Sequence, residues 1–300
     1  MKYSVVIPVF NSAKSLLTLL AEITGYFQQI DFEVILVDDG SNFLETQKTL
    51  AKITELHSFA KIIVLRKNFG KAAALLCGFH HAKGDYIITI DDDGQHNPVD
   101  FKQLIEKQNH DVVIGKYISN KHGIHKRLLS KFKNTLEVFA YGKPYSITIS
   151  PVKLINRDII QEVLAIKSNK PFIASLLFSI TSDIVNVPIT HHKRTDGRSG
   201  FTLPKMWSIV ANMLFNNSSI LLKALSYISV FSIIGILLGW SSLFIWGVST
   251  ESTNLQFSIF LCSSTLLLAI SILGEYLIRI ISGIEQKKPY YVRAIVSKKD

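Results

Sequence analysis

The feature that most constrains this chain is a long apolar stretch near its C-terminal end. The 51 residues from Ala224 to Gly274 contain a single charged residue, Glu251. At the chain average of 19% charged residues, a soluble segment of that length would hold about ten. The composition, 48% hydrophobic, is therefore an average over a mixed-charge globular part and a bilayer-like part. This excludes a simple cytosolic enzyme, a disordered tail protein and a disulfide-stapled secreted domain.

The apolar stretch has the length and the flanking charges of a membrane hairpin. A bilayer core requires about 20 apolar residues in helical form, and we expect two spanning helices over residues 224–250 and 252–278. Lys and Arg flank the outer ends of the pair. The positive-inside rule therefore predicts a multi-pass protein of the cell inner (cytoplasmic) membrane with both termini cytoplasmic. The alternative is a buried hairpin of a large soluble core, although two tandem runs of spanning length are uncommon in soluble chains.

The segments on either side of the hairpin carry their own patterns. Residues 203–223 place apolar side chains at near-helical spacing and include Trp207. This predicts an interfacial amphipathic helix with its tryptophan at headgroup level. The alternative for these residues is a helix packed on the globular domain. We expect residues 279–300 to form a basic cytoplasmic tail.

The formal net charge is +10, of which residues 1–223 carry +8. A basic protein is attracted to nucleic acid, to anionic lipid or to phosphorylated substrates. No clustered aromatic stacking motif accompanies the basic residues, so we do not expect nucleic acid as a partner. The two cysteines, Cys77 and Cys262, lie far apart in the sequence, which fits a reducing compartment and no disulfide.

Residues 1–202 alternate short apolar runs with helical patterns, which predicts an α/β domain. The expected strands are Tyr3–Val9, Glu33–Val37, Lys61–Leu65, Tyr86–Ile90 and Asp111–Gly115. Strands separated by helices indicate βαβ units and a mostly parallel, Rossmann-like sheet covered on both faces. Ligands bind such sheets at the carboxyl ends of the strands. The chemically unusual residues stand at those ends: Asp38 and Asp39, Asn68, Asp91–Asp93 and Lys116.

Three consecutive carboxylates, Asp91, Asp92 and Asp93, follow the fourth expected strand. If the strand geometry continues by one step, Asp91 and Asp93 point the same way, because alternate residues share a face. Two hard oxygen ligands on one side suit Mg²⁺ or Mn²⁺ shared with substrate phosphates. From this pattern alone, a solvated acidic turn is the competing interpretation. Neither a dinucleotide fingerprint nor a P-loop motif occurs in the chain.

Several motifs together resemble one known family. The motifs, in chain order, are Pro8-Val9-Phe10-Asn11, Val37-Asp38-Asp39-Gly40-Ser41, Asn68-Phe69-Gly70-Lys71, Asp91-Asp92-Asp93-Gly94-Gln95-His96-Asn97-Pro98, His192-Lys193-Arg194-Thr195-Asp196-Gly197-Arg198-Ser199 and Gly274-Glu275-Tyr276-Leu277-Ile278-Arg279. Their order and spacing resemble family 2 glycosyltransferases with the GT-A fold. With two C-terminal spans, the similarity is to the polyprenyl-phosphate glycosyltransferases, such as dolichyl-phosphate mannose synthases, bactoprenol glucosyltransferases and the aminoarabinose transferases of lipid A modification. The resemblance extends over nearly the whole chain.

The resemblance implies roles for the residues that match the family motifs. A nucleotide-sugar donor would be bound by Pro8, Phe10, Asn11, Asp38, Asp39, Lys71, Asp91 and Asp92. A divalent cation, Mg²⁺ or Mn²⁺, would be held against the diphosphate by Asp91, Asp93 and Gln95. The acceptor phosphate would meet Lys116, Arg127, Arg194 and Ser199. The residues implied to act in the reaction itself are Asp93, Arg127 and Arg194. The resemblance is also compatible with a homo-oligomer.

The basic segment from Gly115 to Lys143, which includes Asn134, carries the expected acceptor side. A solvated basic helix face or a patch for anionic lipid is the alternative for most of its lysines. Lys116 stands where the family usually has arginine, and lysine cannot bind phosphate in bidentate fashion. An acidic residue that the family places near Pro151 is absent. A phosphate monoester is already largely dianionic at pH 7 and can attack without a general base, so we assign no base.

The expected function is inverting transfer of a single sugar from a nucleotide-sugar to a polyprenyl phosphate, undecaprenyl phosphate in bacteria, at the cytoplasmic face of the membrane. The sequence does not identify the sugar. Two alternatives stay open. The first is a processive polysaccharide synthase, disfavoured because no Q-x-x-R-W motif occurs. The second is a membrane-anchored nucleotide-sugar binding protein with a degenerate site, an alternative that the missing acid and Lys116 leave open.

Overall fold

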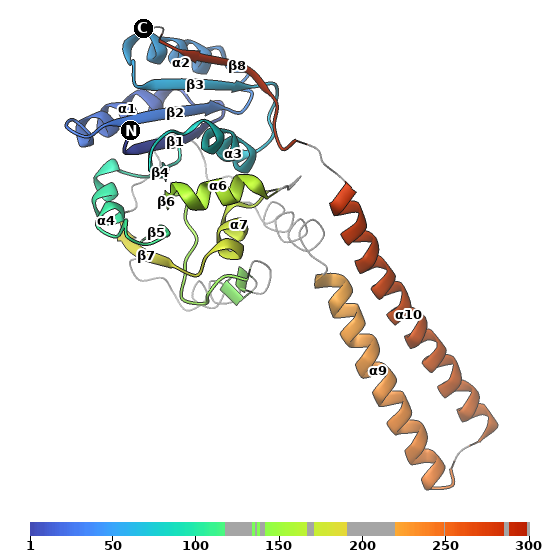
Figure 1. Ribbon diagram of the computed structural model, residues 1–300. Helices are drawn as coiled ribbons and strands as arrows, with labels where there is room; N and C mark the ends of the chain where they lie inside the picture. Colours follow the sequence, from blue (N-terminus) through green and yellow to red (C-terminus); the bar gives the residue numbers. More distant parts are fainter. Residues whose placement is uncertain are drawn as a thin grey trace. The chain divides into compact units, whose positions relative to one another are not determined.

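The computed structural model describes residues 1–117, 134–135, 137–138, 142–166, 171–190, 220–248, 250–284 and 288–298. These residues belong to two compact units (Figure 1). The first comprises residues 1–199 together with 287–300, and the second comprises residues 200–286. Arg127, Arg194 and Ser199 lie outside the described residues, as do positions 203–219 of the expected interfacial helix.

The first unit is built on one eight-stranded sheet with the order β7-β5-β6-β4-β1-β2-β3-β8. Its strands are β1 (Tyr3–Val9), β2 (Phe32–Asp38), β3 (Ala60–Leu65), β4 (Tyr86–Thr89), β5 (Val112–Tyr117), β6 (Lys153–Asn156), β7 (Ile184–Ile189) and β8 (Val292–Ser297). Strands β3, β2, β1 and β4 pair in parallel, as do β5 and β7. Strands β6 and β8 run antiparallel to their neighbours. The predicted mostly parallel sheet is thus confirmed, and the five predicted strands agree with β1–β5 to within one or two residues.

Helices cover both faces of the sheet in the order that the βαβ pattern predicts (Figure 1). They are α1 (Lys14–Tyr26), α2 (Leu44–Leu56), α3 (Lys71–His81), η1 (Pro98–Asp100), α4 (Phe101–Ile105), α6 (Arg157–Ala165) and α7 (Ile173–Ile180). One apolar core packs α1, α2 and α4 against the sheet, and the other packs α3, α6 and α7 against the opposite face. Alternation along β1 divides the strand between the two cores: Val5 and Ile7 join the first, and Val6 joins the second.

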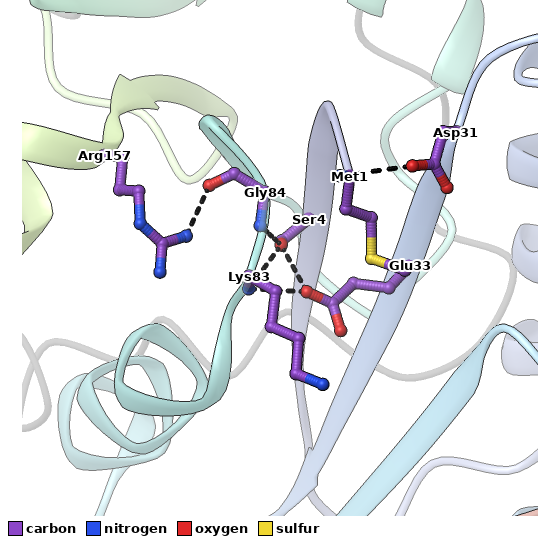
Figure 2. Close-up of polar contacts among 7 residues, drawn as sticks. All are labelled: Met1, Ser4, Asp31, Glu33, Lys83, Gly84 and Arg157. Atoms are coloured by element: carbon purple, nitrogen blue, oxygen red, sulfur yellow. Dashed lines mark hydrogen bonds and ion pairs between the residues drawn. The ribbon is translucent and has the colours of Figure 1, made fainter.

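A polar cluster ties together the amino-terminal ends of the strands, away from the acidic loops (Figure 2). The Ser4 hydroxyl donates to Glu33 Oε1 at 2.7 Å and accepts from the backbone amide of Gly84 at the same distance. The amide of Lys83 donates to Glu33 Oε1 at 2.6 Å, and Arg157 Nη1 donates to the carbonyl of Gly84 at 2.8 Å. Because Ser4 and Glu33 are buried, these bonds replace hydration that both side chains lose on folding.

The second unit contains two long apolar helices, α9 (Ile220–Ile245) and α10 (Glu251–Ile284). Each is long and apolar enough to cross a bilayer, over Leu225–Ile245 and Glu251–Ile278. Within the pair, Trp240 Nε1 donates to Asn254 Oδ1 at 2.9 Å, and the Trp240 ring stacks on Phe257. These contacts join the two helices near the tight turn that connects them.

The sequence of the turn accounts for the ends of both helices. After α9, the amide of Val248 bonds to the carbonyl of Leu243 and that of Gly247 to Phe244, with Gly247 at φ +65°. This is a Schellman ending, which requires a residue that tolerates positive φ. Before α10, the amide of Thr253 donates to the Thr250 hydroxyl and the amide of Thr250 to the Thr253 hydroxyl. Such a reciprocal pair is a capping box.

Strand β8 is a feature that the sequence analysis did not predict. Residues 292–297 lie in the segment expected to be a basic tail, yet they pair antiparallel with β3, with Ile63 opposite Ile295. Helix α10 also extends to Ile284, beyond the expected end of the second span. The last strand of the sheet therefore comes from the part of the chain that follows the hairpin. Strands β7 and β8, which flank the hairpin in the sequence, form opposite edges of the same sheet.

Candidate active site

Four loops gather at the carboxyl ends of the adjacent parallel strands β3, β2, β1 and β4. They follow Leu65, Asp38, Val9 and Thr89, and they contain most of the residues that the sequence analysis selected. Because neighbouring parallel strands end at the same edge of a sheet, these loops form one surface. The start of the antiparallel strand β6 lies at that edge as well.

Asp38 and Asp39 are both buried, and both accept hydrogen bonds from backbone amides. Asp38 Oδ1 accepts from the amide of Ser41 at 2.9 Å, which fixes the turn after β2. Asp39 Oδ1 and Oδ2 accept from the amides of Phe69 and Gly70, at 2.7 and 2.9 Å. Burial raises the pKa of Asp39, and the two amide bonds oppose that rise. The Asp39 carboxylate thus holds the loop that leads into α3.

Asn11 joins the first two loops. Its Oδ1 accepts from the backbone amides of Asn42 and Phe43, at 3.0 and 3.2 Å, and its own amide donates to the Ser41 hydroxyl at 2.8 Å. The backbone of Asn11 has φ +53°, a conformation that asparagine tolerates better than most side chains. Of the other first-strand residues expected at the donor, Pro8 is buried within β1 and Phe10 is 47% exposed. Phe10 is therefore the side chain of this segment that is open to a ligand.

Lys71 and Asp91 form an ion pair at the centre of this edge. Lys71 is the first residue of α3, and its Nζ lies 2.5 Å from Asp91 Oδ1. Gly70 precedes the helix at φ +95°, so the chain turns sharply into α3 there. The amino terminus of a helix carries a partial positive charge. Together with Lys71, it makes this position favourable for anionic groups.

Asp92 is directed toward the loop after β1, away from Lys71. Its Oδ2 accepts weakly from the amide of Phe10, at 3.4 Å, and its carbonyl accepts from the hydroxyls of Ser12 and Ser15. Burial raises the pKa of Asp92 to about 6, and the neighbouring charges of Asp91 and Asp93 add to the rise. Asp92 thus links the acidic segment to the β1–α1 loop.

Asp93, like Asp91, lies within electrostatic range of Tyr117 of β5. Its Oδ1 accepts from the backbone amide of Gln95 at 3.1 Å. Burial raises the pKa of Tyr117, and Asp91 and Asp93 both add to this effect. The Tyr117 ring stacks on His96, with 5.7 Å between centroids, and its hydroxyl lies 3.3 Å from His96 Nε2. The expectation that Asp91 and Asp93 point the same way stays a prediction.

The three carboxylates fit a divalent cation by their charge and their chemistry. They lie close enough for Asp91 and Asp93 to raise the pKa of Asp92, an excess of negative charge that a cation would offset. No group of three His, Cys, Asp or Glu side chains arranged to share one metal ion occurs in the described parts of the chain. The oxygens that could hold a cation here are those of the Asp91 and Asp93 carboxylates and of the Gln95 side-chain amide, with substrate oxygens and water completing its shell.

The expected acceptor side is only partly described. Lys116 is exposed at the end of β5, whereas Arg127, Arg194 and Ser199 fall outside the described residues. Lys143 and Asn134 belong to the same basic segment. They are hydrogen-bonded to each other and to backbone carbonyls nearby. Lys143 Nζ donates to Asn134 Oδ1 at 2.5 Å and to the Ile147 carbonyl at 2.6 Å. Lys143 is 1% exposed, so its charge supports the loop and is not presented to a lipid.

The sequence analysis missed Lys153, the first residue of β6 and 5% exposed. It pairs in register with Thr89 of β4, two residues before Asp91. Burial lowers the pKa of Lys153 to about 8, and Lys71 lowers it further while Asp91 opposes the change. A lysine in a run of apolar residues, Val152 to Ile155, is the sequence signal that could have identified it.

The comparisons with known proteins agree with this fold and site. The family model described as "Glycosyl transferase family 2" matches residues 4–164, and the chain belongs to that family. The matched region contains β1 to β6 and all four loops of the site. The protein is therefore a glycosyltransferase.

Curated relatives match the chain over almost its full length. Undecaprenyl-phosphate 4-deoxy-4-formamido-L-arabinose transferase from Sodalis glossinidius is 27% identical, covering 99% of this chain and 94% of the relative. The protein of the same name from Proteus mirabilis is 28% identical, covering 99% and 95%. The similarity thus includes the apolar hairpin as well as the family domain.

Among solved structures, glucosyl-3-phosphoglycerate synthase from Mycobacterium tuberculosis, in complex with Mn²⁺, uridine diphosphate and phosphoglyceric acid, aligns with a TM-score of 0.51. The two chains are 15% identical, and the alignment covers 71% of this chain and 76% of the other. At this identity the likeness concerns the fold, which is that of the GT-A glycosyltransferases.

Proposed function

We propose that the protein transfers a single sugar from a nucleotide-diphosphate sugar to a polyprenyl phosphate, in bacteria undecaprenyl phosphate, at the cytoplasmic face of the inner membrane. One observation carries the proposal: a family 2 site with Lys71 paired to Asp91 occurs in one chain with two apolar helices of spanning length. An acceptor with a polyprenyl tail cannot leave the bilayer, so its transferase must work at the membrane surface. The full-length relatives are named as undecaprenyl-phosphate sugar transferases.

The sheet supports the proposed topology. Strands β1–β7 precede the hairpin and β8 follows it, yet all eight belong to one sheet. If α9 and α10 span the membrane, the segments before and after them lie on the same side of it. The flanking Lys and Arg favour the cytoplasm for that side.

In the reaction, an oxygen of the acceptor phosphate attacks the anomeric carbon of the sugar. The bond between this carbon and the β-phosphate oxygen of the donor breaks, the nucleoside diphosphate leaves with the electron pair, and the configuration inverts. The acceptor phosphate is largely dianionic at pH 7, so no side chain has to remove a proton. The leaving diphosphate gains negative charge, which Lys71 and the amino terminus of α3 stabilise.

The donor and acceptor ends use different residues. Phe10, Asn11, Asp38, Asp39 and Asp92 support the nucleoside end, in part by bonding the loops to one another. Asp91, Asp93 and Gln95 would hold Mg²⁺ or Mn²⁺, which neutralises charge on the diphosphate. We assign the acceptor phosphate to Lys116, Arg127, Arg194 and Ser199.

The test is transfer by the full-length protein in detergent. The protein is given undecaprenyl phosphate, Mg²⁺ or Mn²⁺ and a panel of nucleotide-sugars that includes a nucleotide derivative of 4-deoxy-4-formamido-L-arabinose. The lipid product is separated by thin-layer chromatography. We expect one donor to yield a single-sugar product. A ladder of products would indicate a processive synthase, and failure with every donor would contradict the proposal.

The matched variants are Asp93→Ala and Asp31→Ala. Asp93 belongs to the acidic segment of the site, whereas the Asp31 side chain is exposed and pairs with the terminal ammonium of Met1. Asp93→Ala should abolish transfer and Asp31→Ala should retain it. Near-normal turnover by Asp93→Ala would remove Asp93 from the cation site.

A further inference from the structure

Lys153 is a buried cation that the proposed reaction has not used. It begins β6, where it lies opposite Thr89 of β4 and Ile114 of β5. Along β6, Leu154 packs in the core beneath α1, and Ile155 packs in the core beneath α3. Because alternate residues of a strand share a face, Lys153 lies on the α3 side of the sheet, with Ile155.

The same alternation along β4 brings the acidic segment toward Lys153. Ile87 belongs to the α3 side and Ile88 to the α1 side. Continuing this alternation, Thr89 and Asp91 fall on the α3 side, where Asp91 meets Lys71. Lys71, Asp91 and Lys153 therefore form one cluster, and the electrostatic effects of Lys71 and Asp91 on Lys153 agree with this.

The cluster holds two lysines and one carboxylate. Lys71 already occupies Asp91 Oδ1, at 2.5 Å. Within the described residues, the Lys153 ammonium makes no hydrogen bond or ion pair. The Lys153 side chain is 5% exposed, so its ammonium keeps only part of its hydration, and without a protein partner this is costly.

Lys143 shows what a structural buried lysine looks like in this protein. It is 1% exposed, against 5% for Lys153. Its Nζ donates to Asn134 Oδ1 and the Ile147 carbonyl, and it lies 3.6 Å from Glu137 Oε2. The protein thus supplies acceptors for Lys143, whereas the charged groups that act on Lys153 are Lys71 and Asp91, and Asp91 is already paired with Lys71. An anion would complete that cluster.

We propose that Lys153 binds a phosphate oxygen of a substrate at the reaction centre, beside Lys71 and Asp91. The proposal rests on the proposed function for the identity of the substrates, of which two carry phosphate: the donor through its diphosphate and the acceptor through its monoester. Asp91 follows β4, whose two neighbours in the sheet are β1 and β6. Lys153 therefore supplies positive charge from the β6 side of Asp91, opposite the loop after β1. When Asp91 holds a cation, Lys153 and Lys71 are both available to the phosphate.

The experiment compares Lys153→Met with Lys143→Met in the full-length protein in detergent. Thermal unfolding is recorded first, without ligand. Removing a buried charge that lacks a partner should raise the melting temperature, so Lys153→Met is expected to melt higher than the wild type. Lys143→Met removes a charge that is hydrogen-bonded and leaves its two acceptors without a donor, so this variant should melt lower than the wild type. If Lys153→Met melts lower or fails to fold, Lys153 is a structural residue and the proposal is wrong.

Binding is then measured by calorimetry with two probes that need no turnover. Inorganic pyrophosphate with Mn²⁺ represents the donor diphosphate, and farnesyl phosphate represents the acceptor monoester. Loss of a charge-assisted hydrogen bond should weaken one of them about ten- to hundredfold in Lys153→Met. A loss confined to pyrophosphate assigns Lys153 to the donor, and a loss confined to farnesyl phosphate assigns it to the acceptor.

Unchanged affinity for both probes, or no binding of either by the wild type, would overturn the proposal. The two proposals can fail separately. If the wild type binds a probe through Lys153 but transfers no sugar from any donor, the phosphate site stands and the proposed function fails.

Discussion

Lys71 Nζ lies 2.5 Å from Asp91 Oδ1, so a carboxylate that is expected to bind a divalent cation already has a cationic partner. The two functions of Asp91 therefore compete when no substrate is bound. Once a diphosphate enters, the Lys71 ammonium can leave Asp91 and pair with a phosphate oxygen. Asp91 is then free to bind the cation. Binding of nucleotide and cation should consequently be coupled.

Replacing Lys71 by Met tests whether Lys71 and a divalent cation compete for Asp91. Both side chains are partly exposed, so the pair contributes only about 1 kcal/mol, or about fivefold in affinity. We expect Lys71→Met to bind Mn²⁺ about fivefold more tightly without substrate and pyrophosphate more weakly with Mn²⁺ present. Calorimetry measures both. Lys67→Met is the control, because the Lys67 ammonium lies over the Phe69 ring and not at Asp91. Weaker Mn²⁺ binding by Lys71→Met would contradict the competition.

The Asp39 carboxylate should be required for the order of the loop before α3. In Asp39→Asn, one of the two amides, of Phe69 or Gly70, would face an NH₂ group that cannot accept its hydrogen bond. We expect the variant to lose about 2 kcal/mol of stability and residues 66–71 to exchange amide hydrogens faster. Hydrogen exchange with mass spectrometry reads this out.

Asp38→Asn is the matched control for this change. Among the described residues Asp38 bonds the amide of Ser41 alone, and the Oδ1 of an asparagine can still accept that bond, so Asp38→Asn should leave the exchange of residues 66–71 unchanged. Equal protection of residues 66–71 in Asp39→Asn and the wild type would show that Asp39 does not hold this loop.

The reactivity of the Cys77 thiol should show whether the C-terminal segment, which contains Tyr290, is packed against the core on the α3 side of the sheet. Burial raises the pKa of this thiol to about 12, so very little of it is the reactive thiolate at pH 8. Tyr290 packs against the core that contains Cys77 and lies within electrostatic range of the thiol. In a Cys262→Ser background, Cys77 should resist maleimide at pH 8. Adding Tyr290→Ala should open the site, lower the pKa of the thiol toward its usual value and increase labelling at least tenfold.

Ile295→Ala is the control for the labelling experiment, because Ile295 is half exposed on β8 and does not cover the thiol. Its labelling rate should match that of the background protein. Rapid labelling of Cys77 without any change at Tyr290 would show that the C-terminal segment is not closed over this core.

Gly40 should be far less tolerant of a side chain than Gly25. At Gly40, φ is +71°, and an added Cβ would lie 2.5 Å from the backbone carbonyl carbon of Lys67. We expect Gly40→Ala to destabilise the protein by about 2 kcal/mol or more. Gly25 lies within α1 and has open space around it, so Gly25→Ala should stabilise by about 0.5–1 kcal/mol. Thermal unfolding in detergent compares the two, and equal melting temperatures would refute the strain at Gly40.

The sequence predicts much of this site because parallel strands end at a common edge. Once β1 to β4 are recognised, Asp39, Lys71 and Asp91 must lie near one another, as they do. The fold adds what periodicity cannot specify. Lys153 reaches the cluster only because β6 runs antiparallel between β4 and β5. Likewise, β8 is a short run among basic residues, and it pairs with β3, which ends at Leu65, 227 residues before β8 begins at Val292.

The position of β8 also bears on how the molecule is made. During synthesis, β3 leaves the ribosome long before Val292, and both apolar helices are translated in between. The β3 edge stays unpaired during that interval, and exposed strand edges recruit other chains. If α9 and α10 span the membrane as proposed, the sheet becomes complete only after both helices have been synthesised, and the pairing of β8 is then the last step of folding.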